Sequence, residues 1–131
     1  MRRWMTGAAV AAMLAGAAAP AGAQQTQQAP LEGTLTVVVG YPPGGSSDRI
    51  ARLVADRLKD RAGVPVVVEN KTGAGGRIAA QALHAAPATQ NVLMLANPAV
   101  MVVAPLVYTQ PGYDAQRDFK PVSLVSRYKF A

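Results

Sequence analysis

Two glycine-rich corners between strand and helix patterns constrain the fold of this 131-residue chain more than any other feature. In the first, a nearly continuous apolar run at 35–39 leads through 41–48, with the sequence YPPGGSSD, into a helical pattern. In the second, a β-branched run at 66–69 leads through 71–76, with the sequence KTGAGG, into another helical pattern. The order strand–helix–strand–helix–strand predicts an α/β fold with a parallel sheet and helices on both faces.

Hydrophobic periodicity sets the expected bounds of both helices. The first begins at a capping serine, Ser46 or Ser47, and runs to about residue 61, and the second runs from about 76 to 86. We expect the apolar residues of each helix to face the sheet, namely Ile50, Leu53, Val54 and Leu58, and then Ile78, Ala82, Leu83 and Ala86.

The C-terminal part of the chain is less regular. A third strand is expected at 92–95, followed by an apolar stretch at 99–107 that favours a helix but contains a proline. Residues 108–118 are predicted to form a loop, and 119–125 a fourth strand near the sheet edge, because a proline lies within it. The chain then stops in strand-like residues, so we expect an incomplete lobe.

The first residues have the pattern of a secretory signal peptide spanning 1–23. Arg2 and Arg3 form its basic segment, an alanine-rich apolar segment follows, and 21–23 is an A-x-A cleavage site. The residues flanking the arginine pair match a twin-arginine signal poorly, which favours the general secretory route over that one. A polar leader at 24–33 is expected to be disordered. These features predict a periplasmic protein that is not embedded in the membrane.

Charge and composition exclude several classes of partner. The net charge of +6 falls to +4 on cleavage after Ala23, because 11 of the 13 Lys and Arg residues remain against seven Asp and Glu residues. These charges are spread along the chain, with no basic stripe interleaved with aromatic residues, so nucleic-acid binding is not expected. The absence of cysteine excludes disulfides and a lipid anchor.

The two corners suggest a binding site for an anion. Free backbone N–H groups and the helix dipole favour negative charge at a helix N-terminus. Corners that follow neighbouring parallel strands lie at the same edge of the sheet and can hold one ligand between them. The residues alone therefore predict a protein that binds a small anion, a carboxylate being favoured.

The sequence lacks the residues that other kinds of binding or catalytic site require. Ile78 stands where a dinucleotide fingerprint needs its third glycine, and neither corner ends in the Gly-Lys-Ser/Thr of a phosphate loop. The one histidine, His84, has no cysteine or second histidine to complete a metal site. No nucleophile has a base placed beside it, so we expect neither an enzyme nor a cofactor or metal.

Three ordered motifs resemble those of a known family. The segment 41–48 followed by Ala51-Arg52, the segment 65–76, and the residues YD, DF and PVSL within 113–124 are similar to three signatures of that family. It comprises the Bug-type substrate-binding proteins of tripartite tricarboxylate transporters. The resemblance covers nearly all of the mature chain.

The resemblance implies a periplasmic-binding-protein-like fold of type II, in which two α/β lobes close on a small organic acid. Residues 34–131 would be part of the N-terminal lobe, and the partners would be a carboxylate and the membrane components of the transporter. Backbone N–H groups of the first two loops would hold the carboxylate. The implied ligand-binding residues are Tyr41, Gly44, Gly45, Ser46, Asp48, Gly75, Gly76 and Asn97.

Most of these candidates have a structural alternative. The glycines at 44–45 equally serve a tight turn, and Asp48 equally pairs with Arg52 at the start of a helix. Asn97 before a proline is a common turn former, and Arg77 either reaches a ligand or is solvated.

The function has alternatives as well. Members of this family are roughly twice as long or more, as two ordinary domains require. The chain is therefore expected to be either part of a working receptor or a truncated, non-functional fragment. A third reading, an exported enzyme acting on a phosphate or acyl ester, would need Ser46 or Ser47 as nucleophile.

Overall fold

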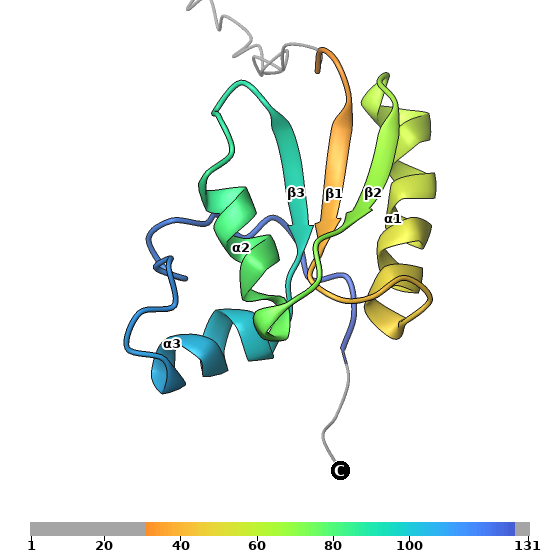
Figure 1. Ribbon diagram of the computed structural model, residues 1–131. Coiled ribbons are helices and arrows are strands. Elements are labelled where there is room, and N and C mark those ends of the chain that lie inside the picture. The colour runs from red at the N-terminus through yellow and green to blue at the C-terminus, as the bar shows by residue number, and fades with distance from the viewer. Residues whose placement is uncertain (1–30, 128–131) are drawn as a thin grey trace, which may run out of the picture.

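Three parallel strands form a sheet in the order β2-β1-β3 in the computed structural model, which describes residues 31–127 (Figure 1). The strands are β1 (Leu35–Val39), β2 (Val66–Asn70) and β3 (Asn91–Leu95). In the register of the sheet, the first residues of all three strands lie side by side, and so do the last. The central strand β1 is hydrogen-bonded along both edges. Its valines are buried because helices also cover both faces of the sheet.

The two main helices cover opposite faces of this sheet. Helix α1 (Ser46–Ala62) connects β1 to β2, and α2 (Arg77–His84), preceded by the 3₁₀ turn η1 (Ala74–Gly76), connects β2 to β3. The strand order reverses direction after β2, so two right-handed crossovers place their helices on different sides. The expected α/β fold with a parallel sheet is confirmed.

Two hydrophobic clusters correspond to these two faces. Val37 and Val39 of β1 pack against Ala51 and Ala55 on the α1 side. On the other side, a second cluster contains three buried residues, namely Ala80, Val100 and Tyr113. Consecutive residues of β3 divide between the clusters, Leu95 joining the first and Met94 the second, as the alternation of a strand requires.

The apolar stretch after β3 is helical, and its hydrogen-bond pattern changes from π-helical to α-helical along the segment. It forms the π-helical turn η2 (Ala99–Val103) and then the short α-helix α3 (Ala104–Val107). Pro105 lies in the first turn of α3, next to the end of η2, and its ring nitrogen has no hydrogen to donate there. The helix favoured from sequence at 99–107 is therefore present, and its proline is accommodated at the junction of the two turns.

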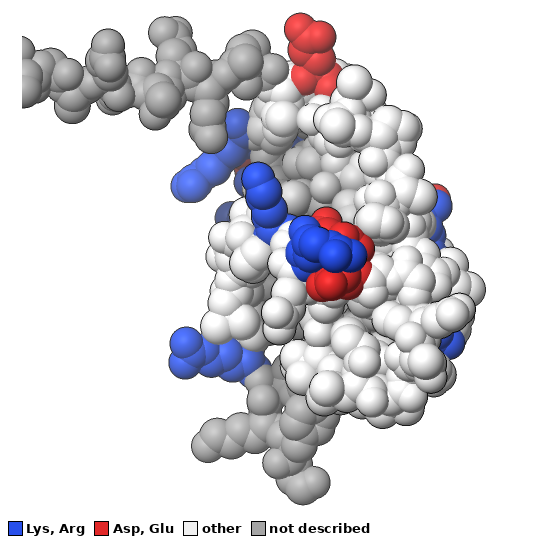
Figure 2. All heavy atoms as spheres, turned by 90° about the vertical axis from the view of Figure 1, so that its left-hand side faces the viewer, with Lys and Arg blue, Asp and Glu red and all other residues white. Residues whose placement is uncertain are grey.

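The loop predicted at 108–118 is also present, and its own side chains fasten it. The carboxylate of Asp118 accepts a hydrogen bond from the Asp114 N–H at 2.7 Å, and Arg117 approaches both carboxylates, at 3.8 Å from Asp114 and 3.7 Å from Asp118. Figure 2 looks onto this side of the molecule, where acidic and basic side chains gather in one place on a largely uncharged face. Exposed pairs of this kind contribute little to stability individually.

Tyr113 anchors the same loop in the second cluster. Its ring packs edge-on against Phe119, with ring centroids 5.6 Å apart, and its hydroxyl donates to the Val100 carbonyl oxygen at 2.6 Å. Replacing Tyr113 with phenylalanine keeps the ring but leaves that carbonyl without its buried partner. We expect the free energy of unfolding to fall by about 1–2 kcal/mol, measured by urea denaturation. An unchanged denaturation midpoint would show that solvent satisfies the carbonyl.

The serine cap predicted for α1 is wrong. The residue before the helix is Gly45, in an extended conformation (φ −72°, ψ 171°), and no side chain caps the helix there. Both serines already lie inside the first turn. The carboxylate of Asp48 instead accepts a hydrogen bond from the Gly44 N–H at 2.8 Å, which fastens the incoming loop.

The predicted inward faces of both helices are partly wrong. Leu53 of α1 is 61% exposed and Ile78 of α2 is 45% exposed. The fully buried positions of α2 are Ala79 and Ala80. Short alanine side chains let each helix approach the sheet closely, whereas the sequence pattern gave most weight to large apolar residues. The other predicted inward residues are half-buried, namely Ile50, Val54, Leu58, Ala82, Leu83 and Ala86.

The fourth strand predicted at 119–125 is also wrong. This segment has no strand geometry, and Val122 and Leu124 are 79% and 68% exposed. A β-strand needs a neighbour to complete its hydrogen-bond ladder, and no strand among residues 31–127 pairs with this segment. Apolar β-branched residues alone do not supply that neighbour.

The signal peptide predicted at 1–23, and the leader at 24–33 apart from its last three residues, lie outside the described residues. Among the helices of residues 31–127, none has the length and apolar character needed to cross a membrane.

Candidate functional site

The loops that follow β1, β2 and β3 all lie at the carboxyl edge of the sheet, because the three strands are parallel (Figure 1). The connections on the two sides of β1 run in opposite directions, so the switch point of the strand order lies beside β1. Open α/β sheets bind ligands in the crevice beyond the strand ends at such a point. Helices α1 and α2 both begin at this edge, so the positive ends of two helix dipoles meet there.

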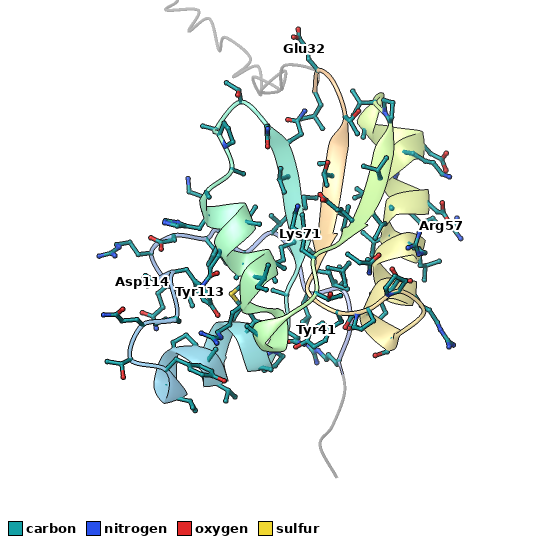
Figure 3. The ribbon with its side chains drawn as sticks, viewed as in Figure 1. Glu32, Tyr41, Arg57, Lys71, Tyr113 and Asp114 are labelled. Atoms are coloured by element: carbon teal, nitrogen blue, oxygen red, sulfur yellow. The ribbon has the colours of Figure 1, made fainter. Side chains whose placement is uncertain are left out.

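The first and second loops touch through their backbones. A Cβ atom on Gly40 would lie 2.7 Å from the Cα atom of Gly76, a separation that only glycine permits. Tyr41 adds a second link, because its hydroxyl donates to the carbonyl oxygen of Gly75 at 3.2 Å (Figure 3). The two loops therefore form one continuous surface, with the Tyr41 side chain between them.

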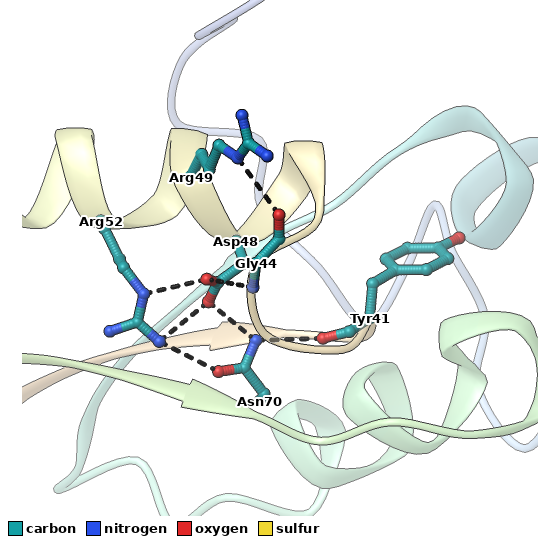
Figure 4. A network of polar contacts seen from close by, with 6 residues as sticks. All are labelled: Tyr41, Gly44, Asp48, Arg49, Arg52 and Asn70. Atoms are coloured by element: carbon teal, nitrogen blue, oxygen red, sulfur yellow. Dashed lines mark hydrogen bonds and ion pairs between the residues drawn. The ribbon is translucent and has the colours of Figure 1, made fainter.

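A buried carboxylate organises the first loop (Figure 4). Asp48 is only 3% exposed, and one of its oxygens accepts hydrogen bonds from the Gly44 N–H at 2.8 Å and from Nε of Arg52 at 2.9 Å. The other oxygen accepts from Nη2 of Arg52 at 3.0 Å and from Nδ2 of Asn70 at 2.9 Å. The same Nδ2 also donates to the Tyr41 carbonyl oxygen at 3.0 Å. We call Asp48, Arg52 and Asn70 the Asp48 clamp.

These contacts keep Asp48 ionised. The hydrogen bond from Arg52, followed by those from Gly44 and Asn70, holds the pKa of the Asp48 carboxyl well below its usual range. The guanidinium of Arg52 lies against this carboxylate in a two-pronged pair, so the negative charge has its compensating positive charge close by. The alternative role foreseen for Asp48, an ion pair with Arg52 at the start of the helix, is confirmed.

The first turn of α1 supplies the hydrogen-bond donors that remain. The N–H of Gly44 is engaged by Asp48, and the N–H of Gly45 is directed at the Pro42 carbonyl oxygen at 3.4 Å. The first helical bond runs from the Arg49 N–H to the Gly45 carbonyl at 3.0 Å. Within residues 31–127, no protein acceptor is found for the N–H groups of residues 46–48. These three groups point out of the helix end, where a helix binds an anion.

The second loop has a left-handed backbone. Residues 73–76 all have positive φ, including Ala74 at 48°, and the Gly76 N–H donates back to the Gly73 carbonyl at 2.9 Å. Arg77 follows this turn, but its side chain is held by the protein. Nε of Arg77 donates to the Ala74 carbonyl at 3.1 Å, and its guanidinium lies 3.8 Å from the centre of the Tyr108 ring.

Asn97 is the second residue of the loop after β3. Its side-chain oxygen accepts a hydrogen bond from the Val100 N–H at 3.2 Å, which starts the helical turn η2. The turn-forming alternative foreseen for Asn97 is therefore confirmed. Val100 in turn lies against the second loop, since a Cβ atom on Gly76 would be 2.7 Å from its Cγ2.

All candidate residues named from sequence lie on these three loops or in the first turn of α1. They are Tyr41, Gly44, Gly45, Ser46, Asp48, Gly75, Gly76 and Asn97. Sequence reasoning missed Asn70 as a site residue. Its signal lay in the register, because Asn70 pairs with Val39 at the end of β1 and so stands beside the start of the first loop.

Comparison with known proteins identifies relatives of this chain. Residues 50–131 match the family model described as "Tripartite tricarboxylate transporter family receptor". The chain is 38% identical over 112 residues to protein BugT of Bordetella pertussis, covering 85% of this chain and 33% of BugT. It is 41% identical over 91 residues to an uncharacterised family protein of Bordetella bronchiseptica, covering 70% of this chain and 27% of that protein.

Solved structures show the same fold. The periplasmic binding protein BugD is 36% identical with a TM-score of 0.65, the match covering 69% of this chain and 30% of BugD. MatC of Rhodopseudomonas palustris with bound malate is 32% identical with a TM-score of 0.61, covering 71% of this chain and 32% of MatC. An R. palustris protein with adipate is 34% identical with a TM-score of 0.60, the match covering 64% of this chain and 28% of that protein.

The chain thus spans about a third or less of the length of the relatives compared here. The match to the family model nonetheless extends over more than half of the chain, and the described fold is that of the binding proteins. The resemblance to Bug-type proteins is confirmed: the chain belongs to the family of tripartite tricarboxylate transporter receptors.

Proposed function

We propose that this chain contributes a lobe of an extracytoplasmic solute-binding protein, which captures a small organic acid for a tripartite tricarboxylate transporter. The observation that carries the proposal is the group of three backbone donors at 46–48, which lies at the same edge of the sheet as the loops after β2 and β3. A carboxylate is the matching ligand, because each of its oxygens accepts hydrogen bonds from N–H groups and its charge suits the helix dipole.

The bound ligands of two relatives support this class of substrate. The structures of MatC and of the second R. palustris protein contain malate and adipate, which are both dicarboxylates. In this proposal, Ser46 and its two neighbours donate to one ligand carboxylate, while Gly75 and Gly76 approach it from the second loop. Tyr41 forms a wall of the cleft, and Asn97 borders it beyond β3.

The remaining parts of the proposal concern location and partners. Residues 1–23 act as a signal peptide that directs the protein to the periplasm, where BugD is described. The protein acts by binding and release, without a catalytic step, and hands its ligand to the membrane components of the transporter. Neither a metal nor a cofactor takes part.

The proposal predicts a specific pattern of perturbed amide signals. We expect succinate, added to the ¹⁵N-labelled protein, to shift the amide resonances of residues 46–48 and 74–75 first, since these N–H groups have no acceptor among residues 31–127. Butyrate, which has the same number of carbon atoms and one carboxylate, should perturb the same amides. Succinamide, which lacks the charge, is the control and should leave them unchanged.

Perturbations elsewhere, or none at any carboxylate concentration, would contradict the proposed site. A protein that also melts without cooperativity would support the alternative of a non-functional fragment.

A further inference from the structure

The hydrogen bonds of Asn70 hold both ends of the first loop. Its Nδ2 donates to the carbonyl oxygen of Tyr41, where the loop begins, at 3.0 Å. The same NH₂ group donates to Asp48 at 2.9 Å, and Asp48 accepts from the N–H of Gly44, where the loop ends, at 2.8 Å. An amide NH₂ group has two hydrogens, so both bonds can form at once. One side chain at the end of β2 thereby sets the span of the loop after β1.

Arg52 has a separate role in the same cluster. The carboxylate of Asp48 belongs to the helical turn whose N–H groups remain free. An uncompensated negative charge at this position would repel an anion bound there. Arg52 reaches the carboxylate with Nε at 2.9 Å and Nη2 at 3.0 Å, which pairs the charge without using those N–H groups.

We propose that Asn70 and Arg52 are positioning residues for carboxylate binding: Asn70 fixes the shape of the first loop, and Arg52 cancels the charge of Asp48. This inference rests on the proposed function, since it concerns the same anion site. Neither side chain touches the ligand in this scheme. Both act through Asp48, which is buried and bonded on both of its oxygens.

The two roles predict different responses to ligand charge. Loss of Asn70 loosens the loop without changing the net charge of the cluster. It should therefore lower the affinity for monoanions and for dianions by the same factor. Loss of Arg52 leaves Asp48 held by Gly44 and Asn70 but unpaired in charge. Coulomb repulsion scales with the ligand charge, so a dianion should lose more affinity than a monoanion.

The test measures the affinities of succinate and butyrate by amide titration of the wild-type chain and its variants. Asn70→Ala is expected to lower the affinity for both ligands by about threefold to tenfold, the usual size of coupling between neighbouring groups. Arg52→Met is expected to lower the affinity for succinate more than the affinity for butyrate. The double variant Asp48→Asn/Arg52→Met removes both charges. It should therefore lower the affinities for succinate and for butyrate by the same factor.

Two matched controls accompany these variants. Arg57→Met removes the same charge from the same helix, at a side chain that points away from the sheet in Figure 3. Asn91→Ala removes a side-chain bond to the backbone, from Nδ2 to the Glu32 carbonyl at 2.7 Å, at the opposite end of the sheet. Both controls should bind the two ligands as the wild type does.

The outcomes separate this inference from the proposed function. If the wild type binds and both Asn70→Ala and Arg52→Met keep its affinities, the positioning roles are wrong. If the wild type shows no perturbation at 46–48, the proposed function fails, and the clamp is judged on hydrogen exchange of the Gly44 amide. Asn70→Ala should then speed that exchange relative to Asn91→Ala, and equal rates would overturn the inference.

Discussion

Replacing Gly76 with alanine is expected to lower the free energy of unfolding by about 2–4 kcal/mol. Two effects add at this position. The residue has φ of +93°, which is unfavourable for any residue with a Cβ atom, and that atom would lie 2.7 Å from Cγ2 of the buried Val100. The ring of Tyr41, at 3.5 Å, closes the other side.

Gly63 supplies the matched control for this prediction. It also has a left-handed backbone, with φ of +68°, but a Cβ atom there would meet no atom within 4 Å. Gly63→Ala should therefore show the backbone cost alone, about 1 kcal/mol. Urea denaturation of both variants measures the difference. Equal losses of stability in the two variants would mean that the Val100 side chain moves aside without cost. The contact between Gly76 and Val100 would then not hold the second loop against η2.

Replacing Asp48 with asparagine is expected to give the second large effect, and one that depends on pH. The substitution leaves Arg52 without its anion and changes the bonds of Gly44 and Asn70. Because the folded-state pKa of Asp48 is lowered from its ordinary value of 3.8, the wild type binds fewer protons at this group when folded than when unfolded. Its contribution is complete above that ordinary value and is lost as the pH falls through the folded-state pKa.

The wild type and Asp48→Asn should therefore differ most in stability near neutral pH and converge as the pH is lowered below about 4. Thermal melts at a series of pH values provide the measurement. Asp56→Asn is the control, since Asp56 lies on the same helix and its pKa is lowered by the hydrogen bond from Lys59 at an exposed position. Its substitution should have only a small effect. A constant difference for Asp48→Asn across the pH series would contradict the assigned charge state.

The elements that could be predicted from the sequence are those determined by local pattern. The strand at 35–39 is predicted with its observed bounds, because a short, nearly continuous β-branched and apolar run between a polar leader and a Pro-Gly corner favours a buried strand. The corners were predicted because proline and glycine restrict or permit particular backbone angles. The positions of the candidate residues at one edge follow from the parallel order of the strands.

The features that could not be predicted depend on contacts between distant segments. Residues 119–125 have strand-forming side chains, but no strand among residues 31–127 pairs with them. The role of Asn70 depends on its register against β1, which is known only once the sheet has formed. The burial of alanines rather than Ile78 or Leu53 depends on how closely each helix approaches the sheet.

The contact between Gly40 and Gly76 has a consequence for how the site can change during evolution. In the proposed site the donors are main-chain N–H groups, which do not depend on the identity of the surrounding side chains, so substitutions on the loop surfaces would leave the proposed carboxylate contacts in place. The contacts between the two loops also restrict their backbone in the proposed site, so binding there would lose less conformational entropy. Preference among acids can then diverge through residues outside the two corners, while the glycines stay unchanged because no other residue allows the loops to meet.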